Sequence, residues 1–381
     1  SPYRGRMDVL PSGRNLFATD PLSVPTRAAY AQGIKLAEEF IRRHLQDKGD
    51  WPSGVIVDLW GSATMRTAGE EFAMALHLLG IKPVWADGSE RVSGFEILPL
   101  ITLDRPRIDV TLRVSGLFRD VFPTLSNLYQ QAIDALSKRE ESSDWNPYTS
   151  GLENARIYGP APQSYGLGMG SAPEDFSDTG RRAAAEAWLE ASSYAIKGDR
   201  VYQDKKGLKD RVTKADSFVH LQDMPETDLL LSADYAAHEA GFAAAKKFIG
   251  GSVSLYHLDN TDPENPTSRT LAEEIARVVY ARACNPSWLT GMKRHGFRGA
   301  AEISATLFHM SAFANLADVV GPHLFDSYHD ATLGNDDIVK FMSEYNPEAL
   351  AAMRDCFEKL YHSGLWKTRR NFILGDLGVS A

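Results

Sequence analysis

The sequence has little cysteine and no long apolar run. It contains two cysteines in 381 residues, Cys284 and Cys356, and no CxxC pair, so neither a disulfide framework nor a structural zinc site is expected. No stretch approaches the roughly 18 consecutive apolar residues of a membrane-spanning helix, and no apolar signal segment opens the chain. We therefore expect a cytoplasmic protein with no membrane partner. The opening residues lack an initiating methionine, which suggests the interior of a longer polypeptide.

Positive charge is also in deficit. The chain has 41 Lys and Arg against 50 Asp and Glu, a net charge of −9. Contacts to a phosphate backbone need clustered Lys and Arg, so we expect no nucleic-acid partner. The sequence also lacks a Walker A motif, an HExxH motif and a GxSxG elbow. If an ATP-driven reaction is involved, the nucleotide must be hydrolysed by a different chain.

What is present is an ordinary globular composition, 43% apolar and 24% charged, long enough for two or three domains. Strand-like runs at 55–60, 82–86 and 108–114 alternate with helical patterns in the first 150 residues. This alternation predicts an α/β fold with a parallel, doubly wound sheet over 1–150. From about residue 179 helical patterns dominate, so we expect a mixed, mainly α-helical domain over 151–381.

Two loops follow predicted strands and carry charged side chains. Residues 61–70 offer Arg66 and Glu70, and residues 115–123 offer Arg119 and Asp120. Parallel strands would open both loops at one sheet edge, where α/β proteins place ligands. Two plainer explanations stay open. In the first, Glu70 only stabilises the start of a helix, where the helix dipole favours a negative charge. In the second, Arg119 forms a surface ion pair with Asp120 or Glu70.

A glycine-rich segment over 156–170 has the wrong spacing for a dinucleotide fingerprint. Its glycines would allow the backbone and Tyr165 to approach a large flat ligand closely. Among possible metal ligands we retain His238, His257 and Asp259. His238 and Glu239 are adjacent, so on a helix they point about 100° apart and do not readily share one ion.

Several separated stretches together resemble the large subunits of class I metallochelatases, the cobaltochelatase and magnesium chelatase family. They are residues 10–15, 59–61 with 69–70, 105–110, 115–120, 156–159, 269–273 and 285–288. Residues 238–239, 256–259 and 294–299 are similar to the cobalt-inserting branch. The ordered matches extend over nearly the whole chain, which makes them more specific than any one motif.

The resemblance implies a ligase that inserts Co2+, its metal substrate, into hydrogenobyrinic acid a,c-diamide during aerobic cobalamin biosynthesis. It implies that separate AAA+ and integrin-like subunits use ATP and Mg2+, which this chain does not bind. Glu70 matches the family's essential carboxylate and would be catalytic. Ser115 and Gly116 belong to a matching motif and would contact the substrate.

Four arginines are candidates to pair with peripheral carboxylates of the tetrapyrrole, because guanidinium groups bind carboxylates bidentately. They are Arg66, Arg119, Arg156 and Arg269. The second domain would complete the tetrapyrrole cleft. Two alternatives remain, a magnesium chelatase large subunit acting on protoporphyrin IX and a corrinoid-binding module without catalysis.

Overall fold

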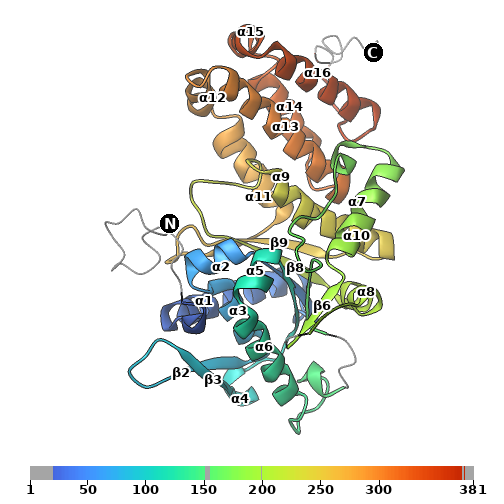
Figure 1. The fold of residues 1–381 in the computed structure, drawn as a ribbon. Helices are drawn as coiled ribbons and strands as arrows, with labels where there is room; N and C mark the ends of the chain where they lie inside the picture. Colours follow the sequence, from blue (N-terminus) through green and yellow to red (C-terminus); the bar gives the residue numbers. More distant parts are fainter. Residues whose placement is uncertain (1–19, 151–154, 199, 371–372, 374–381) are drawn as a thin grey trace. The chain divides into compact units, whose positions relative to one another are not determined.

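The computed structural model describes residues 20–150, 155–198, 200–370 and 373 (Figure 1). The chain forms two compact units. The sheet unit comprises Ser1–Gly168, Leu189–Pro225 and Ile249–Arg269, and the helical unit comprises Met169–Trp188, Glu226–Phe248 and Thr270–Ala381. This division differs from the boundary expected at residue 150, because strands far beyond that residue complete the same sheet.

The main sheet has eight strands in the order β10-β9-β8-β1-β4-β5-β6-β7. They are β1 (Gly54–Leu59), β4 (Asp109–Val114), β5 (Ile157–Gly159), β6 (Tyr194–Lys197), β7 (Arg200–Gln203), β8 (Ser217–Gln222), β9 (Ser254–Asp259) and β10 (Thr267–Thr270). Strands β9, β8, β1, β4 and β5 are parallel, whereas β6 and β7 are antiparallel additions. The predicted α/β class is confirmed.

One predicted strand lies outside this sheet. The run at 82–86 corresponds to β2 (Ile81–Trp85), which pairs antiparallel with β3 (Val92–Ile97) in a separate two-stranded sheet. A local apolar pattern predicts a strand but does not specify its partner. The expectation that this segment continues the parallel sheet was therefore wrong.

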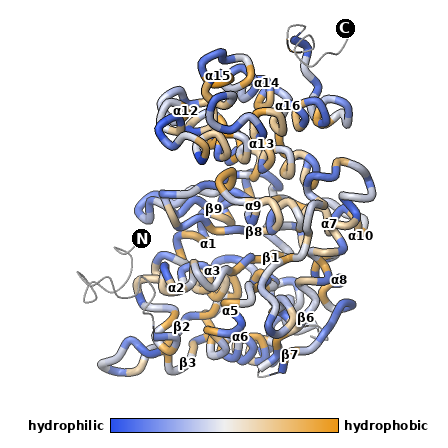
Figure 2. Tube along the Cα trace, turned by 45° about the horizontal axis from the view of Figure 1, so that its top comes forward, coloured by the Kyte–Doolittle hydropathy of each residue, from blue (hydrophilic) through white to orange (hydrophobic). Residues whose placement is uncertain are grey.

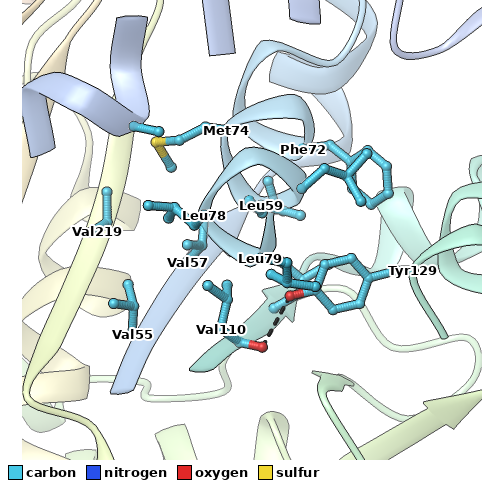
Figure 3. Close-up of a cluster of buried hydrophobic side chains, with 14 of the residues drawn as sticks. Val55, Val57, Leu59, Phe72, Met74, Leu78, Leu79, Val110, Tyr129 and Val219 are labelled. Carbon is cyan, nitrogen blue, oxygen red and sulfur yellow. Dashed lines mark hydrogen bonds between the residues drawn. The ribbon is translucent and has the colours of Figure 1, made fainter. Parts of the chain in front are cut away.

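One face of the main sheet is apolar. The sheet unit has the helices α1 (Arg27–Lys48), α2 (Gly61–Thr67), α3 (Glu70–Leu79), α4 (Leu100–Leu103), α5 (Gly116–Val121), α6 (Pro123–Leu136) and α8 (Lys205–Lys214). Alternate residues of β1, Val55, Val57 and Leu59, point into a core with Phe72 and Leu79 of α3 (Figure 3). Side chains of a strand alternate between the two faces of a sheet, so every second residue of β1 lies on this face. Burial of these apolar side chains stabilises the sheet unit.

Two arginines close the carboxyl end of α3. Arg105 donates to the carbonyls of His77 and Leu78 at 2.7 and 3.0 Å. Arg107 donates to the carbonyl of Leu79 at 3.1 Å and forms an ion pair with Glu141. The last carbonyls of a helix lack partners within the helix and carry partial negative charge. The 105–110 motif therefore has a structural role, because it fixes the end of α3 opposite Glu70.

The helical unit packs mostly around α13. Its helices are α7 (Asp178–Ala191, which runs into the sheet unit), α9 (Ala233–Tyr235), α10 (Gly241–Ile249), α11 (Leu271–Val278), α12 (Pro286–Lys293), α13 (Phe297–Ala317), α14 (Pro322–Ala331), α15 (Asp336–Tyr345) and α16 (Pro347–His362). Figure 2 shows hydrophilic and hydrophobic segments alternating along α13 and α16, as helices with one buried face require. None of the described helices is long and apolar enough to cross a membrane.

Candidate active site

Four segments of the sheet unit meet at the carboxyl edge of the parallel strands. Trp60 follows β1, Ser115 follows β4, Asp223 follows β8 and Asn260 follows β9. Because these strands are parallel, the residues that follow them lie along one edge of the sheet. The helices α2 and α5 begin here and pack against each other. The prediction that the 61–70 and 115–123 loops share an edge is thereby confirmed, although each loop contains a short helix.

Glu70 is the first residue of α3 and is 8% exposed. It follows Gly69, whose φ of +91° lies in the left-handed region that favours glycine. The Thr67 hydroxyl accepts a hydrogen bond from the Glu70 backbone N–H at 3.2 Å. The carboxylate therefore starts the helix, where the dipole favours negative charge.

A buried amide pair fixes one oxygen of Glu70. The Asn260 side chain, which is fully buried, donates from Nδ2 to Glu70 Oε2 at 2.5 Å. Its own Oδ1 accepts from Gln32 Nε2 of α1 at 2.9 Å. This second bond sets which end of the amide faces Glu70. Two segments distant in sequence from Glu70 thus orient its carboxylate.

Glu71 differs from its neighbour, because its carboxyl group is buried between two threonines. Thr64 and Thr67 hydroxyls lie 2.7 and 2.9 Å from its oxygens. Burial raises the pKa of Glu71, and the hydrogen bond from Thr64 offsets this only in part. The folded protein therefore favours the neutral acid more than the unfolded chain does.

Replacing Glu71 by glutamine should remove a pH dependence of stability. The raised pKa stabilises the fold below the ordinary value of 4.5, and this contribution is lost as the pH rises through the folded-state pKa, about 1.4 kcal/mol for each tenfold change in the acidity constant. The free energy of unfolding of the wild type should therefore fall relative to Glu71→Gln between pH 4 and 8. Urea denaturation across that range measures the difference, and parallel curves would contradict the assignment.

Arg66 binds an acid of this chain. Its guanidinium donates to both oxygens of Asp223, each at 2.7 Å, and the Asp223 side chain is 5% exposed. Such bidentate pairs are geometrically specific. The structure therefore couples α2 to the end of β8, and the guanidinium predicted to pair with a substrate carboxylate already holds an aspartate.

Arg119 fixes the glycine-rich loop. Its guanidinium pairs with Asp120 at 2.7 Å and donates to the carbonyls of Pro160 and Ala161 at 2.9 and 2.5 Å. Tyr165, 63% exposed, donates its hydroxyl to Asp120 at 2.8 Å. The bond from Arg119 lowers the pKa of Asp120. The plainer interpretation of an Arg119–Asp120 pair is thus confirmed, and Tyr165 is held at the surface beside it.

Ser115 and Gly116 join the loops. The Ser115 hydroxyl accepts from the backbone N–H of Gly61 at 2.9 Å and from that of Phe118 at 3.2 Å, which caps α5. A Cβ at Gly116 would lie 2.5 Å from the Ser164 carbonyl oxygen. These two residues were predicted to contact substrate, and their observed contacts are within the chain.

Replacing Gly116 by alanine should push the 160–165 segment away from α5. Overpacking of this kind costs about 1–3 kcal/mol, so the urea midpoint should fall and the backbone amide of Tyr165 should exchange faster. Gly94→Ala is the matched control, because nothing lies within 4 Å of its added Cβ. Equal behaviour of the two variants would contradict the close approach.

The second sheet face carries a row of buried polar groups near the same edge. Asp58 of β1 accepts from Arg113 Nη1 at 3.1 Å and from the Trp60 indole N–H at 2.7 Å. His220 Nδ1 lies 3.3 Å from the Asp58 carboxylate, and the His257 ring lies 5.8 Å beyond His220. Register places Arg113, Asp58, His220 and His257 opposite one another across β4, β1, β8 and β9. A polar layer that contains the buried Asp58–Arg113 ion pair thus underlies the edge.

Two predicted arginines lie elsewhere or are engaged. Arg156 forms a buried ion pair with Asp109, the first residue of β4, at 2.8 Å, so it is on the amino-terminal side of the sheet and not among the edge groups. Arg269 pairs with Asp259 at 3.0 Å. Burial of the Asp259 carboxyl raises its pKa, but hydrogen bonds from Thr261 and Arg269 lower it below its ordinary value.

The three predicted metal ligands belong to two different units of the chain. His238 lies in a π-helical turn, Ala236–Ala240, of the helical unit, and its carbonyl accepts from Trp188 Nε1. His257 and Asp259 belong to β9 of the sheet unit. Across residues 20–150, 155–198 and 200–370, no group of three or more His, Cys, Asp or Glu side chains is arranged to hold a metal ion.

Sequence reasoning missed Asn260, Gln32 and Asp223. The rule that selected the 61–70 and 115–123 loops also applies to Asn260, because that residue directly follows the alternating run that forms β9. Asp223 was missed because β8, with its His220 and Gln222, has too few apolar residues to stand out as a strand. Gln32 gave no signal at all, since helix α1 presents it to a residue 228 positions away.

An open, mostly parallel sheet with an oriented carboxylate at its carboxyl edge defines this chain as an α/β protein, a class in which ligands bind at that edge. Residues 1–373 match the family described as CobN/Magnesium Chelatase. The chain belongs to this family. The resemblance found in the sequence is thereby confirmed, although its 10–15 stretch lies outside the residues that the structure describes.

Individual relatives agree with this assignment. The chain is 40% identical over 405 residues to the aerobic cobaltochelatase subunit CobN of a Sinorhizobium species, with 100% of this chain and 32% of that protein covered. It is 39% identical over 389 residues to the same subunit of Pseudomonas aeruginosa, covering 96% and 31%. The solved catalytic subunit of cobaltochelatase from Mycobacterium tuberculosis aligns with a TM-score of 0.88 and 30% identity, covering 94% of this chain and 32% of that one. The chain thus spans about a third of these relatives.

Proposed function

We propose that this chain supplies the catalytic carboxylate, acting as a base, of a cobaltochelatase catalytic subunit. The observation that carries the proposal is Glu70, held by Asn260 at the carboxyl edge of the parallel strands. Similarity to two cobaltochelatase subunits supports the same chemistry. The proposed substrates are Co2+ and hydrogenobyrinic acid a,c-diamide. ATP and Mg2+ are used by AAA+ and integrin-like partner subunits in the cytoplasm.

Metallation of a tetrapyrrole requires a base. Two ring N–H protons leave as the divalent ion enters, so a carboxylate beside the ring nitrogens accelerates the exchange. Glu70 accepts a proton or transfers the incoming ion, while Asn260 holds its Oε2 in place. A carboxylate whose orientation is set before substrate arrives needs no rearrangement during the reaction.

The surface beside Arg119 is the proposed contact for the macrocycle. Tyr165 exposes its ring and is fixed through Asp120, and aromatic rings pack well against flat ligands. Arg119 acts here through the loop it holds. Arg66 and Arg269, each paired with an aspartate, are proposed to align the acids of the edge.

Reconstitution tests this function. The full-length subunit, its two partner subunits and ATP are mixed with metal-free corrinoid and Co2+, and insertion is followed by the visible absorption bands. We expect ATP-dependent cobalt insertion. Insertion of Mg2+ into protoporphyrin IX in its place would identify a magnesium chelatase. Corrinoid binding without any metallation would identify a binding module, and either result overturns the proposal.

Asn260→Asp should shift the pH profile of insertion. A second carboxylate 2.5 Å from Glu70 Oε2 makes the pair share one proton and raises the pH at which Glu70 ionises. If Glu70 acts as a base, the rising limb of the rate should move up by at least about one pH unit, roughly a tenfold loss below the new limb. Asn265→Asp, in an exposed loop, is the matched control. Superimposable profiles would show that Asn260 does not act on Glu70.

A further inference from the structure

The sheet unit carries a basic edge that contrasts with the rest of the chain. Residues 197–214 contain seven Lys and Arg against three Asp, a net charge of +4 in a chain whose total is −9. Two of these cations, Lys197 and Arg200, flank the β6–β7 turn. The other five lie on α8, where Arg211 is buried and pairs with Asp109. The edge is independent of the proposed metallation site.

Five cations of this edge are exposed and mostly free of ion pairs. They are Lys197, Arg200, Lys205, Lys206 and Lys209. Lys205 forms an ion pair with Glu190, in which both side chains are more than half exposed. Within the described part of the chain, the other four form no ion pair. Exposed pairs contribute little to stability, so this cluster is not explained as a stabilising network.

Strand β7 is the last strand of the sheet. It pairs with β6 on one side, and no described strand pairs with its other side. An edge strand directs a row of N–H and C=O groups outward, and these can bind an added strand. Tyr202, 43% exposed, adds an aromatic contact on this strand. Gln203 ends β7 and Lys205 begins α8, so the first lysine of α8 lies two residues after the open strand along the chain.

We propose that β7 and the outer face of α8 form a docking surface for an extended acidic segment of a partner protein. The segment adds beside β7 as a further strand, and its carboxylates pair with the lysines of α8. Like charges on the edge repel a second copy of the same strand, which is how natural edges avoid self-association. The same charges attract an acidic strand, so the basic residues both prevent self-association and favour an acidic partner.

A polypeptide fits this surface better than other anions do. A nucleic acid or an anionic membrane extends far beyond the patch and would meet the net negative charge of the remaining chain. A short segment senses only charges within about 10 Å, the screening distance at 0.1 M salt. Only a polypeptide also supplies main-chain groups that match the outward row of β7.

The test uses the full-length subunit and a fluorescent decapeptide of alternating Glu and Val. We expect salt-sensitive binding and slower amide exchange at Val201 to Gln203. Lys205→Glu/Lys206→Glu/Lys209→Glu should weaken binding at least tenfold. Lys48→Glu/Lys340→Glu/Lys359→Glu, three exposed lysines elsewhere, is the matched control.

A second peptide separates strand addition from charge alone. Methylating alternate backbone nitrogens keeps the carboxylates but blocks main-chain pairing, so the modified peptide should bind at least tenfold more weakly. Equal binding of the two peptides, or equal binding to the two triple variants, would overturn the proposal. So would stronger binding of an anionic vesicle or a single-stranded oligonucleotide than of the acidic peptide.

Discussion

Replacing Glu70 by glutamine should abolish cobalt insertion while leaving corrinoid binding within about threefold. General acid–base catalysis contributes about 10²–10⁴ to a rate, so insertion by the reconstituted subunit should fall by at least about two orders of magnitude. Glutamine has the same size, and its amide oxygen still accepts from Asn260 Nδ2. The loss would therefore report the missing charge and not a disturbed fold.

The matched control for this experiment is the adjacent residue. Glu71→Gln keeps both threonine hydroxyls as partners, and a neutral amide resembles the protonated acid that burial favours. Insertion by that variant should stay within a few-fold of the wild type. If Glu70→Gln retains insertion within tenfold, Glu70 is not the catalytic base. Equal losses in the two variants would indicate a shared effect on α3.

The second large effect concerns stability. Asp58→Ala removes the carboxylate that pairs with Arg113 inside the sheet, where the side chains are 0% and 3% exposed. Breaking a buried ion pair from one side costs about 3–5 kcal/mol, because the other charge stays buried. The free energy of unfolding, measured by urea denaturation, should fall by that amount. Glu190→Ala, which breaks the exposed pair with Lys205, should cost less than about 1 kcal/mol.

A double-mutant cycle separates the pair from its parts. Arg113→Met in the Asp58→Ala background removes the stranded charge and keeps apolar volume, so it should restore most of the lost stability. Additive losses would show that the two charges do not interact. The same result would show that the buried Asp58–Arg113 pair does not stabilise the polar layer beneath the edge.

Local patterns predicted much of the fold. The strand predicted at 55–60 is β1, and the strand predicted at 108–114 is β4. Parallel pairing of β1 with β4 followed from strands alternating with helices. No element was predicted for β7 and α8, because the dense charges of residues 197–214 mask short elements. The distribution of strands between the two sheets was not accessible to periodicity.

The candidate site was predictable only where contacts are local. Arg119 pairs with the residue next to it, and spacing alone suggested that pair. Arg66 meets Asp223, 157 residues away, and no pattern along a single chain specifies such a partner. Glu70 was predicted at the correct end of its helix. The amide that orients it belongs to Asn260, which follows β9, and that strand is separated from β1 by β8. Residue roles in catalysis stay predictions.

Helix α3 is fastened at both ends by parts of the chain that are far apart in sequence. Asn260 holds its first residue, and Arg105 and Arg107 hold its last carbonyls. Helix α3 cannot rotate, shift along its axis or lose a turn without breaking the hydrogen bonds at one of its ends. On the proposed chemistry, the Glu70 carboxylate therefore keeps its position during the reaction. The work of bringing ring and ion together falls on whatever carries the macrocycle inward, so nucleotide-driven motion should be sought in the carrier and not in α3.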